Sequence, residues 1–107
     1  MELSLEGWGI GAAAEAEWVP WGSSGDARAK VVAQADGYVV AIVEAEAGYS
    51  GDPHVHAHAE FLHVLSGTLH TQGRTMVEGD SYVAAPGSTH DDFGTDDGAT
   101  YVSIFKL

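Results

Sequence analysis

Apolar and polar residues alternate along short stretches of this chain, and glycine-containing turns separate these stretches. Valine, isoleucine, tyrosine, phenylalanine and threonine are frequent between the turns, which is typical of β-strands. No segment is long enough to form a helix on propensity alone. Eight strands in so small a chain predict an all-β fold, an antiparallel sandwich or barrel. The predicted strands are residues 29–35, 38–47, 52–56, 60–65, 68–71, 75–77, 81–85 and 100–106.

Local patterns also predict how some of these strands are placed and joined. Residues 38–47 are apolar on both faces in their first half, as expected for a central strand that is covered on both sides. Asp36-Gly37 suits a turn in which φ is positive. Gln72-Gly73 lies between two short strands and predicts a hairpin loop.

The length and charge of the chain limit what it can be. Its 107 residues are the size of one domain, and we assign residues 1–15 to an N-terminal arm and residues 16–107 to a single domain. Sixteen acidic residues oppose four Lys and Arg, which gives a net charge of -12. Such a chain repels phosphate backbones and anionic lipid surfaces, so neither nucleic acid nor membrane is an expected partner.

The chain has no cysteine, which excludes disulfide scaffolds, cysteine-bound zinc and thiol nucleophiles. The first six residues carry acid where a signal peptide would carry base, and no run of 18 apolar residues is present. We therefore expect a cytoplasmic protein. Trp18 and Trp21 are expected to cover the open edge of a small barrel, and the alternative is that one of them lines a ligand pocket.

Four of the six histidines fall within residues 54–63, and their spacing predicts a metal site. In a strand His54 and His56 point the same way with bases roughly 7 Å apart, so both rings can reach one ion about 2.0–2.1 Å from each nitrogen. After a turn, Glu60 begins the next strand and supplies an oxygen. His90 ends a Pro-Gly turn and supplies a third nitrogen.

A competing register uses His56 and His58 as the pair. It leaves only Ala59 before Glu60 and gives the turn no room. His58 is therefore expected in the turn at the mouth of the barrel, facing solvent or a substrate. The role of His70 stays open.

Strand alternation places Phe61, His63 and Leu65 on the outer face of the strand that begins at Glu60. A small barrel also leaves an open sheet edge that pairing of two chains would cover. We therefore expect a homodimer, with these three side chains and the N-terminal arm as candidate contacts.

Two motifs in the chain resemble those of the cupin family. The second, G-x5-P-x-G-x2-H-x3-N, is matched at Gly79, Gly87 and His90, with Ala85 in place of the proline and Gly94 in place of the asparagine. These departures leave the candidate ligands untouched but alter the turn before His90. The first, G-x5-H-x-H-x3-E-x6-G, is matched position for position by Gly48, His54, His56, Glu60 and Gly67.

The resemblance covers residues 18–107, nearly the whole chain. It implies a cupin double-stranded β-helix, an antiparallel jelly-roll barrel, with one divalent transition metal held by His54, His56, Glu60 and His90. Within the superfamily, the chain looks most similar to the branch of the acetylacetone-cleaving dioxygenases and the zinc-holding cupin domains of bacterial anti-sigma factors.

Three imidazoles and one carboxylate leave two positions open on an octahedral ion, as a catalytic metal requires. Fe²⁺ is the favoured ion, and Zn²⁺, Ni²⁺ and Mn²⁺ accept the same ligands. We expect a metal-dependent enzyme that acts on a β-dicarbonyl, ketone or enediol, with an iron(II) dioxygenase that cleaves a C–C bond as the leading hypothesis. Glu60 is the candidate catalytic residue, as a base if it leaves the metal.

Two other functions stay open, a metal-dependent isomerase or lyase and a non-catalytic zinc- or ligand-binding module that senses its ligand. The predicted cavity walls are mainly aliphatic, which suits a small and largely apolar substrate. Of the four Lys and Arg residues, Arg28 and Lys30 precede an early strand and are the candidates to face the mouth of the barrel.

Overall fold

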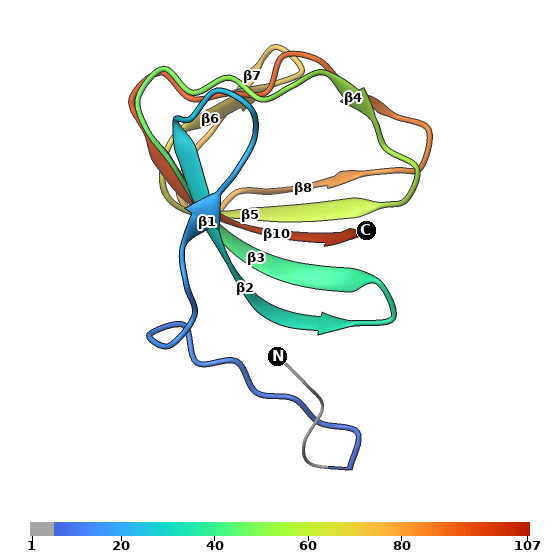
Figure 1. Ribbon diagram of the computed structural model, residues 1–107. Helices are drawn as coiled ribbons and strands as arrows, with labels where there is room; N and C mark the ends of the chain where they lie inside the picture. The colour runs from blue at the N-terminus through green and yellow to red at the C-terminus, as the bar shows by residue number, and fades with distance from the viewer. Residues whose placement is uncertain (1–5) are drawn as a thin grey trace.

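The computed structural model describes residues 6–107, and its regular elements are all β-strands (Figure 1). This confirms the predicted all-β class. None of the described residues forms a helix long and apolar enough to cross a membrane. The strands are β1 (Val19–Pro20), β2 (Ala27–Ala35), β3 (Tyr38–Ala45), β4 (His54–Val55), β5 (Glu60–Gly67), β6 (Leu69–Thr71), β7 (Arg74–Met76), β8 (Ser81–Ala84), β9 (Thr89–His90) and β10 (Ala99–Lys106).

Each of the eight predicted segments overlaps one of these strands, and no end differs by more than two residues. The structure adds β1 and β9, which have two residues each. A two-residue strand shows no alternation, so the pattern of the sequence cannot reveal it. Pairing defines both: β1 pairs with β2, and β9 pairs with β4.

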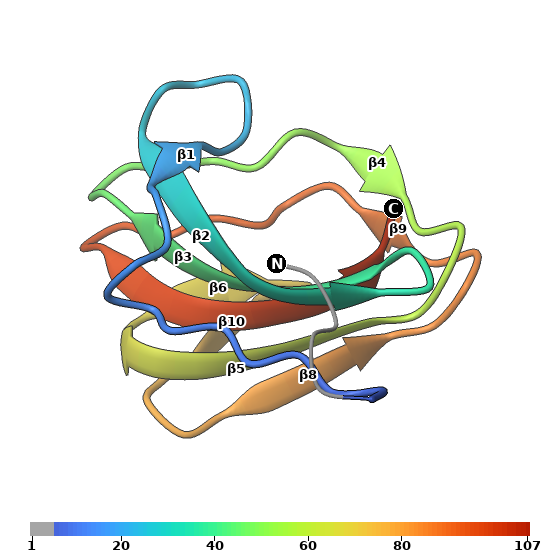
Figure 2. The same ribbon diagram turned by 60° about the horizontal axis from the view of Figure 1, so that its bottom comes forward.

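The strands form two layers (Figures 1 and 2). One layer is a six-stranded antiparallel sheet in the order β1-β2-β3-β10-β5-β8. Two small sheets, β4-β9 and β6-β7, lie over its inner face. The core between the layers is made of apolar side chains that are almost fully buried, among them Val43, Leu62, Val64, Leu69 and Tyr101.

β3 lies in the middle of the large sheet, between β2 and β10, as predicted. Its inward side chains, Val39 and Val43, are buried in the core. Val40 and Ile42 point outward and are only half-buried. The expectation that this strand is covered on both sides is therefore wrong for residues 6–107, because the part of the N-terminal segment near Gly9 approaches only the Val40 end of its outer face.

Both predicted tight turns have the expected backbone. Asp36 and Gly37 have φ of 56° and 81° and join β2 to β3. Gln72 and Gly73 have φ of 52° and 71° and join β6 to β7. Two successive residues with positive φ give the hairpin turn whose twist matches that of the flanking strands.

The glycine that departs from the second motif is explained by close packing. The Gly94 N–H donates to the carbonyl oxygen of His70 at 3.1 Å, and its own carbonyl accepts from the His70 N–H at 2.8 Å. A Cβ at this position would lie 2.5 Å from the carbonyl oxygen of Tyr49 and 3.0 Å from the His70 ring. The backbone of Gly94 is thus held between two segments that leave no room for an asparagine.

We expect Gly94→Ala to destabilise the protein by about 1–3 kcal/mol, the usual cost of an overpacked site. The added methyl group must displace backbone as well as the His70 ring. Urea unfolding followed by circular dichroism measures this loss. A change below about 0.5 kcal/mol, typical of a neutral surface site, would contradict the close packing.

Candidate metal centre

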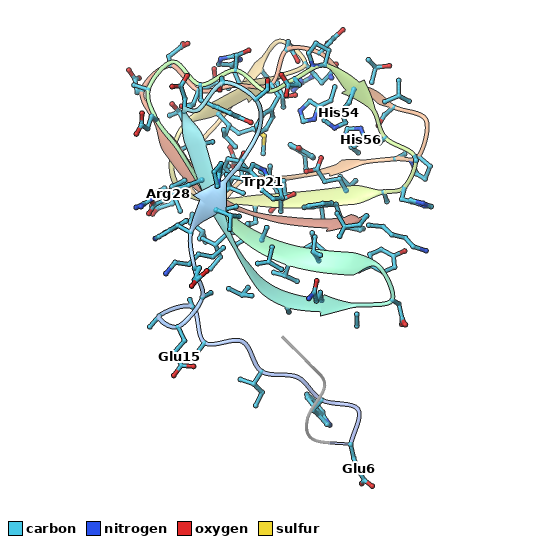
Figure 3. The ribbon with its side chains drawn as sticks, viewed as in Figure 1. Glu6, Glu15, Trp21, Arg28, His54 and His56 are labelled. Atoms are coloured by element: carbon cyan, nitrogen blue, oxygen red, sulfur yellow. The ribbon has the colours of Figure 1, made fainter. Side chains whose placement is uncertain are left out.

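β4 and β9 bring three imidazole rings together above the large sheet. His54 begins β4, His56 follows its last residue, and His90 ends β9 directly opposite His54. The ring centroids lie 4.7 to 5.2 Å apart. One ring nitrogen from each residue lies within 4.8 Å of the others, so the three could hold one metal ion. Figure 3 shows His54 and His56 on the side of the sheet away from the N-terminal segment.

Hydrogen bonds fix the orientation of two of these rings. His54 Nδ1–H donates to the carbonyl oxygen of Asp52 at 2.9 Å. His56 Nδ1–H donates to the hydroxyl of Ser88 at 3.1 Å, and that hydroxyl donates to the carbonyl oxygen of Ala85 at 2.6 Å. With Nδ1 protonated, the Nε2 of each neutral ring carries a free lone pair. This is the usual arrangement of metal-binding histidines.

The third ring, that of His90, is only 7% exposed, and its Nδ1 atom is buried without a hydrogen-bond partner. Burial lowers the pKa of His90, so the ring is neutral at neutral pH, the form that binds metals. An unpartnered buried polar atom costs about 1–3 kcal/mol. Its placement 4.0 Å from Glu60 Oε1 is explained if a cation lies between them.

Glu60 is the carboxylate next to the three rings. It begins β5 and points inward, and its Oε1 lies 3.0 Å from His56 Nε2. The Tyr82 hydroxyl donates to Oε1 at 3.1 Å from β8, and the Ser103 hydroxyl donates to Oε2 at 2.7 Å from β10. Both strands that flank β5 therefore hold this carboxylate in place.

The chemistry of these donors fits a divalent transition ion. His56 Nε2 and Glu60 Oε1 each present a lone pair to the other at 3.0 Å, which is repulsive unless a proton or a cation lies between. The buried His90 Nδ1 needs a partner as well. Three neutral nitrogens and one anionic oxygen suit zinc, iron, nickel and manganese.

We expect Tyr82→Phe to weaken metal binding by about 10- to 100-fold, the usual effect of losing a group that supports a ligand. Burial, followed by the charge of Glu60, raises the pKa of Tyr82 well above its usual range, so its hydroxyl stays a donor at all working pH values. Titration with Zn²⁺ against a competing chelator measures the affinity. Tyr38→Phe is the matched control, since Tyr38 is exposed at the start of β3. Equal affinities in the two variants would contradict this role.

An open cavity of about 410 Å³ lies in front of the cluster. His54, His56, Glu60 and His90 all line it. Five of the other lining residues are aromatic, and two of them, Trp21 and Phe105, form a tilted pair with centroids 5.7 Å apart. The aromatic residues of the cavity wall are Trp21, Tyr49, Phe93, Tyr101 and Phe105.

This cavity corrects two of the sequence predictions. Trp21 lines this cavity, which agrees with the alternative that one tryptophan lines a ligand pocket. Trp18 lies outside the cavity and packs against Arg28 and Lys30, whose charged groups are 4.1 and 4.8 Å from the centre of its ring. Arg28 also pairs with Glu44 at 2.7 Å and does not line this cavity (Figure 3). The two tryptophans therefore lie in different places and do not together cover one edge of the barrel. Arg28 and Lys30 point outward, because side chains alternate between the two faces of β2.

Lys106 replaces Arg28 and Lys30 as the cation at the cavity. It is the one Lys or Arg among the described residues that line this cavity. His58 is exposed in the turn after β4 and contributes to the same rim, where the sequence placed it. Lys106 thus brings one positive charge to the lining, which also contains the carboxylate of Asp52.

The other two histidines lie outside the cluster. His63 points outward from β5, as predicted, and its Nδ1 lies 2.6 Å from the Ser81 hydroxyl. His70 Nδ1–H donates to the carbonyl oxygen of Asp92 at 3.0 Å, and its Nε2 lies 3.7 Å from Asp96. His70 therefore braces the segment that follows His90 and contributes no ligand atom to the cluster.

Sequence reasoning missed four residues that support the ligands. Tyr82 and Ser103 hold Glu60, Ser88 holds His56, and the Phe93 ring packs edge-on against His90 at 4.6 Å. Ser103 carried a signal, because it is a polar residue on the apolar inward face of β10. The other three depend on which strands and turns become neighbours.

The fold and the three-histidine cluster together define a cupin, as the motifs implied. The sequence profile of the ChrR cupin-like domain matches residues 9–106, so the chain belongs to this family. Among curated proteins, no sequence gives a significant match.

Solved structures confirm the cupin fold. A putative acetylacetone dioxygenase from Methylibium petroleiphilum PM1 superposes with a TM-score of 0.86 at 19% identity, over 99% of this chain and 81% of the other. An acetylacetone dioxygenase from Acinetobacter johnsonii gives 0.77 at 14% identity, over 99% and 77%. A chain from the complex of Rhodobacter sphaeroides SigE with the anti-sigma ChrR gives 0.72 at 14% identity, over 89% and 52%.

Proposed function

We propose that this protein is a metal-dependent cupin enzyme that acts on a small, largely apolar chelating substrate. The leading form of the proposal is an iron(II) dioxygenase that cleaves a C–C bond of a β-dicarbonyl compound. One observation carries it: the cluster of His54, His56, His90 and Glu60 forms part of the wall of an open cavity. A structural metal site would be closed by its own ligands, whereas a catalytic site keeps open positions toward the substrate.

In this proposal, one group of residues would hold the metal ion and another would enclose the substrate. His54, His56 and His90 supply the neutral nitrogens, and we propose Glu60 as the fourth ligand. Its hydrogen bonds from β8 and β10 oppose movement. Glu60 is also the carboxylate best placed to accept the proton that a β-dicarbonyl loses when it binds as an enolate.

The cavity suits a compact and mostly apolar molecule. Trp21 and Phe105 offer flat apolar surface near the rim, and Tyr49, Phe93 and Tyr101 continue it inward. Burial raises the pKa of Tyr49 and of Tyr101, so neither hydroxyl serves as an anionic base.

A bound divalent ion would supply Lewis acidity toward a chelating dicarbonyl and, as iron(II), reactivity toward dioxygen. One diketone and one dioxygen contain the atoms of two smaller carbonyl products, so cleavage needs no further reductant. The oxygen consumed should then equal the diketone lost.

Oxygen uptake by protein loaded anaerobically with Fe²⁺ tests the proposal. We expect uptake with acetylacetone or a larger β-diketone, at one dioxygen per diketone. The same protein loaded with Zn²⁺ is the matched control, because zinc has no redox chemistry. No uptake by the iron form with any diketone in the panel would contradict the dioxygenase.

A second candidate is a non-catalytic zinc-binding or sensing module. The match to the ChrR cupin-like domain and the likeness to a chain of the SigE–ChrR complex favour it. Its signature is one tightly held zinc per chain and no turnover of any candidate substrate. An isomerase or lyase would instead convert its substrate without consuming oxygen.

A further inference from the structure

We propose that a second cavity, behind the candidate metal centre, binds a small carboxylate that carries an apolar group, and that Arg74 pairs with the carboxylate. This goes beyond the proposed function and does not depend on it.

The second cavity has a volume of about 520 Å³ and is lined by the β6–β7 hairpin, by β8 and by the turn that precedes His90. β8 is the last strand of the six-stranded sheet, and no ladder among the described residues joins it to the hairpin. The two layers therefore stay apart at this edge. Cavities of about 300–1,000 Å³ are typical of small-molecule sites.

This cavity is distinct from the one in front of the metal centre. Among the described residues, only His56 and His90 line both. Glu60 lines the front cavity, whereas Tyr82, whose hydroxyl donates to Glu60, lines the second one. Ser88, which holds His56, lines the second cavity as well. A molecule bound there would lie behind the ligands and their support, and we call this space the rear cavity.

The register of the hairpin turns Arg74 toward the rear cavity. Thr71 lies directly opposite Arg74, and Leu69 lies opposite Met76. Directly opposed residues of an antiparallel pair project from the same face, and Leu69, Thr71 and Met76 are all buried. Arg74 therefore belongs to the inward face of the hairpin, and it lines the rear cavity although it is exposed to solvent.

The charge of Arg74 is free to bind an anion. None of the ion pairs within residues 6–107 involves Arg74, whereas Arg28 pairs with Glu44 at 2.7 Å. No Asp or Glu of the described residues lines the rear cavity. The nearby carboxylate of Asp92 accepts the backbone N–H of Gln72 at 2.7 Å. A guanidinium binds a carboxylate through two parallel N–H groups, so Arg74 favours this kind of anion.

The rest of the wall suits a molecule with one polar and one apolar end. Thr71 is only 8% exposed, and no hydrogen bond joins its hydroxyl to another residue between 6 and 107. Because Thr71 lies opposite Arg74, its hydroxyl is placed to donate to the same carboxylate. Met76, Val83 and Ala84 offer apolar surface to a short hydrocarbon group. A single guanidinium in a chain of net charge -12 disfavours a dianion.

The front cavity is the rival site for a carboxylate, because Lys106 lines it. Its lining also contains Asp52 and Glu60, whose negative charges oppose a further carboxylate. The rear cavity combines one cation with no acidic residue among those described. We therefore expect a carboxylate to bind in the rear cavity rather than the front cavity when no metal is added.

Heteronuclear NMR of the full-length protein, titrated with hexanoate without added metal, tests the proposal. We expect saturable shifts of the amide signals of residues 71–76 and 81–85, with the indole signal of Trp21 unchanged. Hexanamide has the same chain without the charge and should bind at least about 10-fold more weakly. Acetate should also bind more weakly than hexanoate, by about fourfold for each buried methylene that it lacks.

Arg74→Gln should weaken hexanoate binding by about 10- to 100-fold, the usual effect of losing hydrogen bonds to a charged group. Arg28→Gln is the matched control, because it removes the same group from the outward face of β2, away from the rear cavity. The control should bind hexanoate as the wild type does. Both variants should retain the β-sheet circular dichroism spectrum, since both arginines are exposed.

Any of three results would overturn the proposal. The first is the absence of saturable shifts at residues 71–76 and 81–85, including the case in which only Trp21 and the front cavity respond. The second is equal affinity of Arg74→Gln and Arg28→Gln for hexanoate. The third is equal affinity of the wild type for hexanoate and hexanamide, which would assign binding to apolar surface alone.

Discussion

His90→Ala is expected to lower the affinity for Zn²⁺ by more than about 100-fold and to leave less than one ion in ten chains after gel filtration. Loss of a ligand should exceed the 10- to 100-fold effect of losing a supporting residue. The side chain is buried beside Glu60 and has no other partner for its Nδ1. Elemental analysis of the purified protein gives the metal content directly.

His70→Ala is the control for this result. It also removes one imidazole, but that ring donates to the carbonyl oxygen of Asp92 in the segment after His90 and lies outside the cluster. This variant should retain one ion per chain. Equal metal content in the two variants would show that acidic surface groups, and not the cluster, bind the ion.

The second large effect is on thermal stability. Zn²⁺ at about 100 times its dissociation constant should stabilise the folded state by about 2.7 kcal/mol. For a domain of this size, each kcal/mol shifts the melting temperature by about 4–8 °C, so an increase of roughly 10–20 °C is expected. Thermal unfolding with and without chelator measures it.

The same titration on His90→Ala should leave the melting temperature unchanged. Magnesium gives a second control, because it prefers oxygen ligands and keeps its water. A rise with zinc that persists in His90→Ala, or an equal rise with magnesium, would contradict binding at the three imidazoles.

Much of the fold follows from short-range pattern. Strand alternation places Leu62 and Val64 inward and His63 outward, as observed, because side chains on a strand alternate between its faces. Asp36-Gly37 and Gln72-Gly73 form the predicted hairpin turns, since both need residues that accept positive φ. The β1 and β9 strands could not be predicted, because each has only two residues and is defined by its pairing with β2 or β4.

The candidate site was also predictable only in part. His54, His56, Glu60 and His90 could be picked from spacing, and the structure brings them to one cavity. Of the residues that support Glu60, Ser103 could have been identified as a polar residue on the inward face of β10. Tyr82 could not, because it reaches Glu60 only through the pairing of β8 with β5.

Charge placement was the least predictable part of the chain. Arg28 and Lys30 were expected at the mouth, but alternation along β2 turns them outward, and Lys106 from the last strand lines the cavity instead. Which face of an early strand points inward depends on its register with β3, and a bulge between Val31 and Ala33 shifts that register.

Anomalous diffraction from crystals grown with Zn²⁺ tests the central claim most directly. We expect one strong peak per chain, about 2.0–2.2 Å from a nitrogen of each of His54, His56 and His90 and from an oxygen of Glu60. A map with no peak among these four side chains, or with the ion bound only at the exposed acidic loops, would contradict it.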